Sequence, residues 1–249
     1  MASEAGDIGD TAGRDRAVPP SRLRHLRGDG RPGTGPRYHL WCFVRQWHAT
    51  HALWLALALL ALWLAATGRE GPVWIAASAL GLALLPAAIE GLTQVRLPRG
   101  FTFAVGVFVA LTIVGGELWD LYQRAAWWDV AMHLLSGAVV AGIGLAGALT
   151  LLGEARPRVG PTLPLLFAWF ASLAVAGLWE LFEFSLDEGY GFSTQPSLAD
   201  TMHDIGWASL GAGLATLAGA AHLTGRRTGP FGRWIEGAVA ENAYRFEGR

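Results

Sequence analysis

Six long apolar stretches constrain the fold of this chain more than any other feature. Each is close to the 20 or so residues that a helix needs to cross a bilayer. No water in the hydrocarbon core can satisfy backbone N–H and C=O groups, so such segments must form helices. We therefore predict an all-α fold, a polytopic six-helix transmembrane bundle. The stretches cover residues 48–67, 72–91, 101–122, 127–152, 162–187 and 200–223.

The composition also indicates a membrane protein. The 249 residues are 52% hydrophobic and only 16% charged, which is little charge for a soluble chain of this length. A net charge of −1 provides no basic surface for nucleic acid. Cys42 is the single cysteine, which excludes an internal disulfide and a cysteine zinc site.

Polar sequence flanks the apolar region on both sides. Residues 1–37 are rich in Gly, Pro, Asp and Arg without apolar periodicity, which is typical of disorder, and we assign residues 1–46 to a disordered N-terminal tail. We assign residues 47–224 to the six-span domain and residues 225–249 to a second tail. This second tail contains one short amphipathic helix at about residues 231–246.

The distribution of arginine predicts the orientation. If the N-terminus is cytoplasmic, only Arg69 and Arg124 of the 19 basic residues lie on the outer side. Basic residues concentrate in cytoplasmic loops of membrane proteins. We therefore expect six spans with both termini in the cytoplasm, and membrane lipids as the partners of the bundle.

Ionisable side chains recur at the outer ends of the last four stretches. They are spaced three or four residues apart within each stretch, so each set shares one helix face. At about 1.5 Å of rise per residue, the deepest lie roughly 6–12 Å below the helix ends. Charged groups at such depth are costly and usually face a bundle interior or a water-filled cavity. The residues are Glu117, Asp120, Asp129, His133, Glu180, Glu183, Asp187, Asp200, His203 and Asp204.

Two kinds of site fit this pattern. Carboxylates and histidines from neighbouring helices build metal centres in bundles, and these residue types suit Mg²⁺, Ca²⁺, Mn²⁺, Zn²⁺ or Fe. The same groups also suit a metal-free network of protons and ion pairs. For the metal site, the predicted ligands are Asp129, Asp200 and Asp204, with Glu117 and Asp120 as further candidates. Glu180, His133 and Glu183 are the predicted catalytic groups, the first two as alternative general bases.

Some of these acids have a simpler structural explanation. Asp200 could be the N-cap of the last apolar helix, because aspartate is a preferred capping residue. Asp187 and Glu188 could be ordinary loop residues, and Gln195 is expected to be one. For these residues the structural and functional explanations stay open.

The ordered motifs resemble a known family. They are ELWDLY at 117–122, WWDVAMHLLSG at 127–137, WELFEF at 179–184 and DTMHD at 200–204, followed by Gly211 and Ala212. Together they resemble the YjdF-type inner-membrane proteins of bacteria, a family known mainly as a domain of unknown function. The resemblance covers roughly residues 50–220. It implies a multi-pass protein of the bacterial inner membrane and supplies no established activity.

A more distant similarity is to VanZ-like proteins, which are linked to glycopeptide resistance and the cell envelope. The matching positions are Asp129, His133, Glu183, Gln195, Asp200 and Asp204, although Asp204 stands where that family is expected to have Asn. The similarity implies a site that faces the envelope.

Three functions are consistent with the sequence. The first is a metal-dependent enzyme that acts on a lipid or envelope intermediate at the outer leaflet. The second is a proton-coupled or ion-coupled transporter that uses the acids as a relay, although no inverted repeat is apparent. The third is a membrane scaffold whose acids form an internal network. Protein partners cannot be derived from these patterns.

Overall fold

The computed structural model describes residues 44, 48–98, 100–153, 160–191, 194–226 and 229–242. These residues are helices and short connections, with no strand among them. They belong to one compact unit, Arg31–Arg249. The predicted N-terminal tail lies outside the described residues except for residue 44.

The described helices follow the predicted apolar stretches closely. Five of them are long and apolar enough to cross a membrane, which supports a multi-pass membrane protein. The sixth predicted span corresponds to α9, which has 26 residues but is not among these five, since its glycines and polar residues lower its hydropathy. The six-span count is therefore not confirmed. The helices are α3 (His48–Ala66), α4 (Glu70–Thr93), α5 (Phe101–Val109), η1 (Ala110–Leu118), α6 (Leu121–Arg124), α7 (Ala126–Leu152), α8 (Thr162–Tyr190), α9 (Leu198–Leu223) and α10 (Pro230–Glu241).

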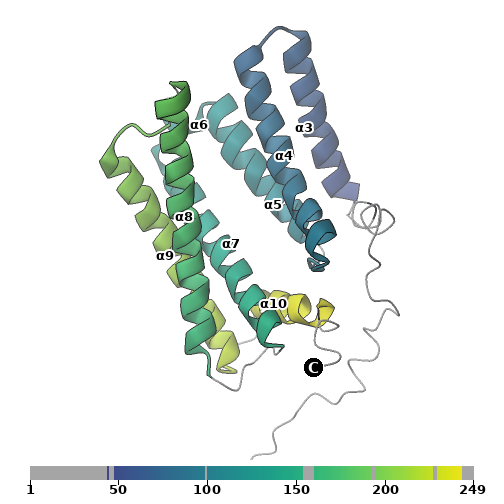
Figure 1. Ribbon diagram of the computed structural model, residues 1–249, viewed down its shortest axis with the longest axis vertical. Coiled ribbons are helices and arrows are strands. Elements are labelled where there is room, and N and C mark those ends of the chain that lie inside the picture. Colours follow the sequence, from purple (N-terminus) through teal and green to yellow (C-terminus); the bar gives the residue numbers. More distant parts are fainter. Residues whose placement is uncertain are drawn as a thin grey trace, which may run out of the picture. The chain divides into compact units, whose positions relative to one another are not determined.

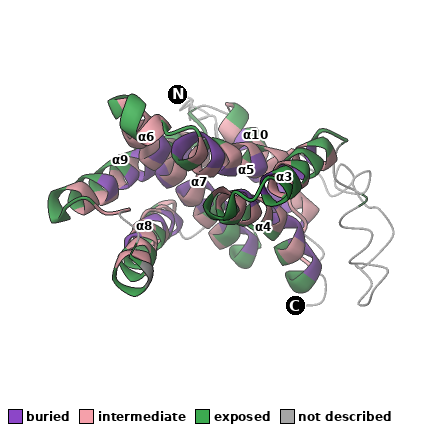
Figure 2. Cartoon of the chain, turned by 90° about the horizontal axis from the view of Figure 1, so that it is seen from above, coloured by how far each residue is buried: buried purple, intermediate pink, exposed green. Residues whose placement is uncertain are grey.

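The helices form two groups (Figure 1). In the first, α3, α4 and α5–η1 pack around a core that includes Trp54, Leu57 and Ala83, and the Trp54 indole donates a hydrogen bond to the Ala83 carbonyl at 3.1 Å. In the second, α7, α8 and α9 all pack against one another. Viewed end-on, α8 and α9 lie on one side of α7, and α3, α4 and α5 on the other (Figure 2).

The third span was predicted to be one helix over residues 101–122, and the structure differs from this prediction. It is α-helical to Val109 and continues as wider π-helical turns over Ala110–Leu118. The chain then turns at Asp120, whose φ of 60° lies in the left-handed region that aspartate tolerates better than most residues. π-helical turns are rare and frequent at functional sites. Here they carry Glu117 near the C-terminal end of the span.

Two glycines allow α7 and α9 to approach closely. A Cβ atom added at Gly137 would collide with the Ala208 backbone carbonyl, and one added at Gly211 would collide with the Leu134 carbonyl. Such close approach through small residues drives helix association in membranes. At the same level the Ser172 hydroxyl of α8 donates a hydrogen bond to the Gly137 carbonyl at 3.0 Å. The three helices are therefore fixed together near the middle of α7.

The helix predicted in the C-terminal tail is α10, which ends at Glu241. It lies across the end of α7 (Figure 1) and packs Ile235 and Val239 against Leu145 and Leu149. Asn242 then joins the two helix groups. It accepts a hydrogen bond from the Arg96 backbone N–H at 2.8 Å and donates one to the Arg96 carbonyl at 2.8 Å.

We predict that Gly211→Ala destabilises the protein. The added methyl group must push α9 away from the Leu134 carbonyl, and overpacking of this kind costs about 1–3 kcal/mol. The control is Gly213→Ala, two residues along the same helix, where a Cβ meets nothing within 4 Å. Thermal unfolding in detergent should show a lower midpoint for Gly211→Ala only. Equal midpoints for the two variants would contradict the packing described here.

Candidate functional site

The predicted site residues converge on one cavity of about 590 Å³. Its walls come from the third span, α6, α7, α8 and α9. The residues Glu117, Asp120, Asp129, His133, Glu183, Asp200 and Asp204 all line it. Among the predicted catalytic and ligand residues, Glu180 is the one that does not line this cavity.

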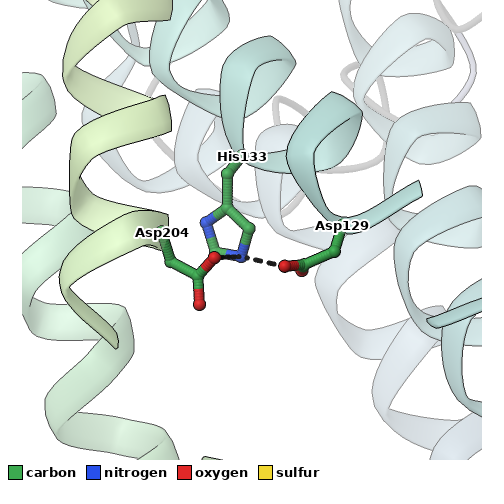
Figure 3. A group of neighbouring side chains, drawn as sticks. All are labelled: Asp129, His133 and Asp204. Atoms are coloured by element: carbon green, nitrogen blue, oxygen red, sulfur yellow. Dashed lines mark ion pairs between the residues drawn. The ribbon is translucent and has the colours of Figure 1, made fainter. Parts of the chain in front are cut away.

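Asp129, His133 and Asp204 form the centre of the site (Figure 3). The imidazole Nε2 of His133 lies 3.3 Å from a carboxylate oxygen of Asp129 and 3.7 Å from one of Asp204. One potential ligand atom from each of the three side chains lies within 4.8 Å of the other two. The exposed side-chain fractions are 7% for Asp204, 16% for His133 and 34% for Asp129, so the cluster is most buried at Asp204 and opens toward Asp129.

Local helix geometry explains this convergence. Asp129 and His133 are four residues apart and share one face of α7. His133 lies one turn before Gly137, and Asp204 lies one turn before Ala208, where α7 and α9 approach most closely. The glycine contact therefore places Asp204 opposite His133. Substituting residues in this contact should alter the cluster without touching a ligand.

The cavity has an excess of negative charge. Its walls contain six acidic residues and His133, and no arginine is among the described residues that line it. A charge inside a membrane protein is costly unless it is paired or neutralised. The least exposed of these carboxylates, above all Asp204, therefore need a proton, a bound cation or His133 as a partner.

Glu180 is buried beside the cavity and is held by Gln195. It is 5% exposed, and the Gln195 side-chain amide donates hydrogen bonds at 2.9 Å to its carboxylate and at 2.9 Å to its backbone carbonyl. Gln195 was expected to be a plain loop residue, but the structure gives it this clamping contact. The Gln195 contact anchors the segment before α9 to α8.

Glu183 is the carboxylate of α8 that reaches the cavity. The indole N–H of Trp179, one turn earlier, donates a hydrogen bond at 2.9 Å to one of its oxygens. This contact fixes the orientation of the side chain. The second carboxylate oxygen takes no part in that bond.

Asp187 organises the connection between α8 and α9. Its carboxylate accepts hydrogen bonds from the Thr194 backbone N–H at 2.8 Å, the Thr194 hydroxyl at 2.7 Å and the Gln195 backbone N–H at 2.9 Å. Asp187 therefore has a structural role, but the prediction that Asp187 and Glu188 are loop residues is wrong, because both lie within α8. For Asp200 the capping explanation is wrong, because Ser197 is the N-cap of α9 and its hydroxyl accepts the Asp200 N–H at 3.2 Å.

The turn after η1 forms one exposed rim of the cavity. Asp120 pairs with Arg124 at 3.5 Å, and both side chains are largely exposed, so this ion pair contributes little stability. Glu117 is also exposed on this rim. Because Asp120 is exposed and paired with Arg124, it is less suited to bind a buried metal ion than Asp129 or Asp204.

Tyr122 is a cavity residue to which the sequence analysis gave no role. Its ring packs directly on Gly116, where an added Cβ would collide with it. Burial raises the pKa of the Tyr122 hydroxyl well above its usual range, and the nearby carboxylates of Asp129 and Glu117 raise it further. The group therefore remains a neutral hydroxyl at the cavity wall. Its position in the sequence, two residues after Asp120, could have indicated that Tyr122 lies beside the acidic site.

Comparison with known proteins identifies the class to which the chain belongs. Residues 49–225 match the model of a family described as predicted membrane proteins, DUF2238, and the chain belongs to this family. The match does not confirm the YjdF-type assignment or the similarity to VanZ-like proteins, which stay predictions. No curated protein and no solved structure matches the chain.

We predict that Asp187→Ala loosens the segment before α9. Loss of the three accepted hydrogen bonds should raise the amide hydrogen-exchange rates of Thr194 and Gln195 by about tenfold or more. The exposed neighbour Glu188 provides the control, because Glu188→Ala removes an acid without touching these amides. Unchanged exchange in Asp187→Ala would show that the segment is held by other contacts.

Proposed function

We propose that this protein is a membrane enzyme that binds one divalent cation at Asp129, His133 and Asp204. The bound cation would polarise an oxygen of the substrate or activate a water molecule. The observation that carries the proposal is the convergence of three ligand atoms from α7 and α9 within 4.8 Å, inside an acidic cavity.

The ligand spacing favours a cation over a simple ion pair. Metal–ligand bonds of about 2.0–2.1 Å in a tetrahedral site put neighbouring ligand atoms about 3.3 Å apart. The distances from His133 Nε2 to the two carboxylates are 3.3 Å and 3.7 Å. A single N–H on that nitrogen can point at only one of the two carboxylates, whereas a cation between them would contact all three groups.

The neighbouring acids take distinct roles in this proposal. Glu183 is the better general base, because it lines the cavity and keeps one oxygen outside its bond with Trp179. Glu180 is held by Gln195 away from the cavity lining and acts as a positioning residue. His133 cannot serve as the base while its Nε2 is a ligand.

The remaining predicted ligands lie further out. Asp200, Glu117 and Asp120 line the same cavity but do not belong to the three-residue cluster. We assign them to the entrance, where their charge attracts cations from solution. A coordinated water molecule could connect Asp200 to the centre, one turn before Asp204 on α9.

A proton-coupled or ion-coupled transporter is the alternative, because the same three side chains could pass protons. Against it, the walls deeper in the cavity are formed by small and apolar residues such as Phe108, Val140 and Ala176. A relay would need titratable groups along that path. A scaffold role would use the acids as an internal network, but it would not require three potential ligand atoms to converge in one cavity.

We further propose that α9 is a sixth span. Its 26 residues give a length of about 39 Å, and it packs along α7 and α8. An even number of spans puts both termini on the same side of the membrane. The arginine distribution favours the cytoplasmic side of a bacterial inner membrane for both. The site then lies near the outer leaflet.

We predict about one divalent metal ion per chain in protein purified in detergent without chelator. His133→Ala and Asp204→Ala should each lower the metal content at least about tenfold, because each removes one of three ligands. Elemental mass spectrometry on the purified protein gives this ratio directly.

The matched control is His203→Ala, which removes an exposed histidine next to Asp204 that does not line the cavity. It should retain the metal. Metal-free wild-type protein, or stoichiometric metal in folded Asp204→Ala, would rule out the proposed centre and favour the proton network.

A further inference from the structure

The cavity changes in character along its length. On α7, the lining residues run from Ala126 to Val140, about 21 Å at 1.5 Å of rise per residue. The ionisable ones, Asp129 and His133, come before Ser136, Gly137 and Val140, which have no ionisable side chain.

The other walls show the same order. The third span runs from Glu117 at the rim to Phe108 inside, and α8 runs from Glu183 to Val175 and Ser172. The hydrogen bond between Ser172 and Gly137 shows that the cavity-lining parts of α7 and α8 reach the same level inside the protein. The cavity is therefore acidic at one end, and the described residues that line the other end carry no ionisable group.

The inner half also has an incomplete wall. α8 and the third span both line the cavity, but α8 packs chiefly against α7 and α9. Val175 lines the cavity and is still 47% exposed. Because α8 and the third span do not pack extensively on each other, a hydrocarbon chain could enter from the side between these two helices.

We infer that the substrate is a membrane amphiphile, an aminophospholipid, whose hydrocarbon chain occupies the inner half and whose head group lies at the cation site. This inference rests on the proposed function. A lipid of the leaflet on that side has its head outward and its chains inward, in the same order as the cavity walls. It can therefore enter without turning over.

The charges of the cavity select the head group. The phosphate ester of the lipid would contact the cation held by Asp129, His133 and Asp204. The acids that remain, Glu117 and Asp200 among them, would repel a head group that carries only negative charge. A head group with an ammonium beside the phosphate suits both the cation and the acids: its phosphate contacts the cation, and its ammonium donates hydrogen bonds to the remaining carboxylates.

The test is photolabelling in nanodiscs of phosphatidylcholine. The probe is a phosphatidylethanolamine with a diazirine in the middle of one chain, and adducts are located by mass spectrometry. We expect adducts on inner lining residues such as Phe108, Val140 and Val175. Unlabelled phosphatidylethanolamine should compete better than phosphatidylglycerol or phosphatidylcholine.

A blocking variant makes the result specific. Ala176→Trp fills the inner half and should lower this labelling about tenfold or more, while the metal content stays unchanged. The matched control is Leu178→Trp, on the same helix but 64% exposed and outside the cavity lining. Val140→Trp blocks the cavity from α7 and provides a second variant if Ala176→Trp does not fold.

The outcomes separate the two proposals. Suppose that the protein binds stoichiometric metal. If labelling is then undiminished in both blocking variants, or if all three unlabelled lipids compete with the probe equally well, the proposed substrate class is wrong and the proposed function still stands. Wild-type protein without metal overturns the proposed function, and with it the phosphate contact on which this inference depends.

Discussion

The close contact between α7 and α9 is the constraint on which the rest of the structure depends. Gly137 and Gly211 bring the backbones together because neither has a side chain that would collide with the opposite helix. In a bilayer there is little hydrophobic gain from packing two apolar helices, so van der Waals contact of this kind carries the association. One turn further along, the same geometry places Asp204 beside His133 and Asp129. The packing of α7 on α9 and the geometry of the Asp129, His133 and Asp204 cluster therefore both depend on this glycine contact.

The second constraint is electrostatic. The cavity carries many carboxylates and no described arginine along its walls, so the least exposed acids, above all Asp204, need a proton, a bound cation or His133 as a partner. The acids that are not in the centre have structural duties that limit their freedom. Asp187 holds the segment before α9, and Glu180 is clamped by Gln195. Only the central cluster and Glu183 combine access to the cavity with defined geometry.

Much of the fold was predictable because apolar length and backbone hydrogen bonding leave few choices in a membrane. Helix spacing alone placed Asp129 and His133 on one face of α7. The pairing of α7 with α9 was not predictable, because many glycines occur in both helices and only the structure shows that Gly137 and Gly211 are the contacting ones. The π-helical end of the third span was also missed, since its sequence is as apolar as an ordinary helix. Sequence equally could not separate Asp187, which is structural, from Glu183, which reaches the cavity.

The most direct test of the account is pulsed electron paramagnetic resonance of Mn²⁺ bound to protein with ¹⁵N-labelled histidine. We predict one Mn²⁺ per chain, coupled to a single imidazole nitrogen, and loss of that coupling when His133 is replaced while other histidines remain. Bound Mn²⁺ without nitrogen coupling, or coupling that persists without His133, would contradict the proposal that Asp129, His133 and Asp204 hold a cation.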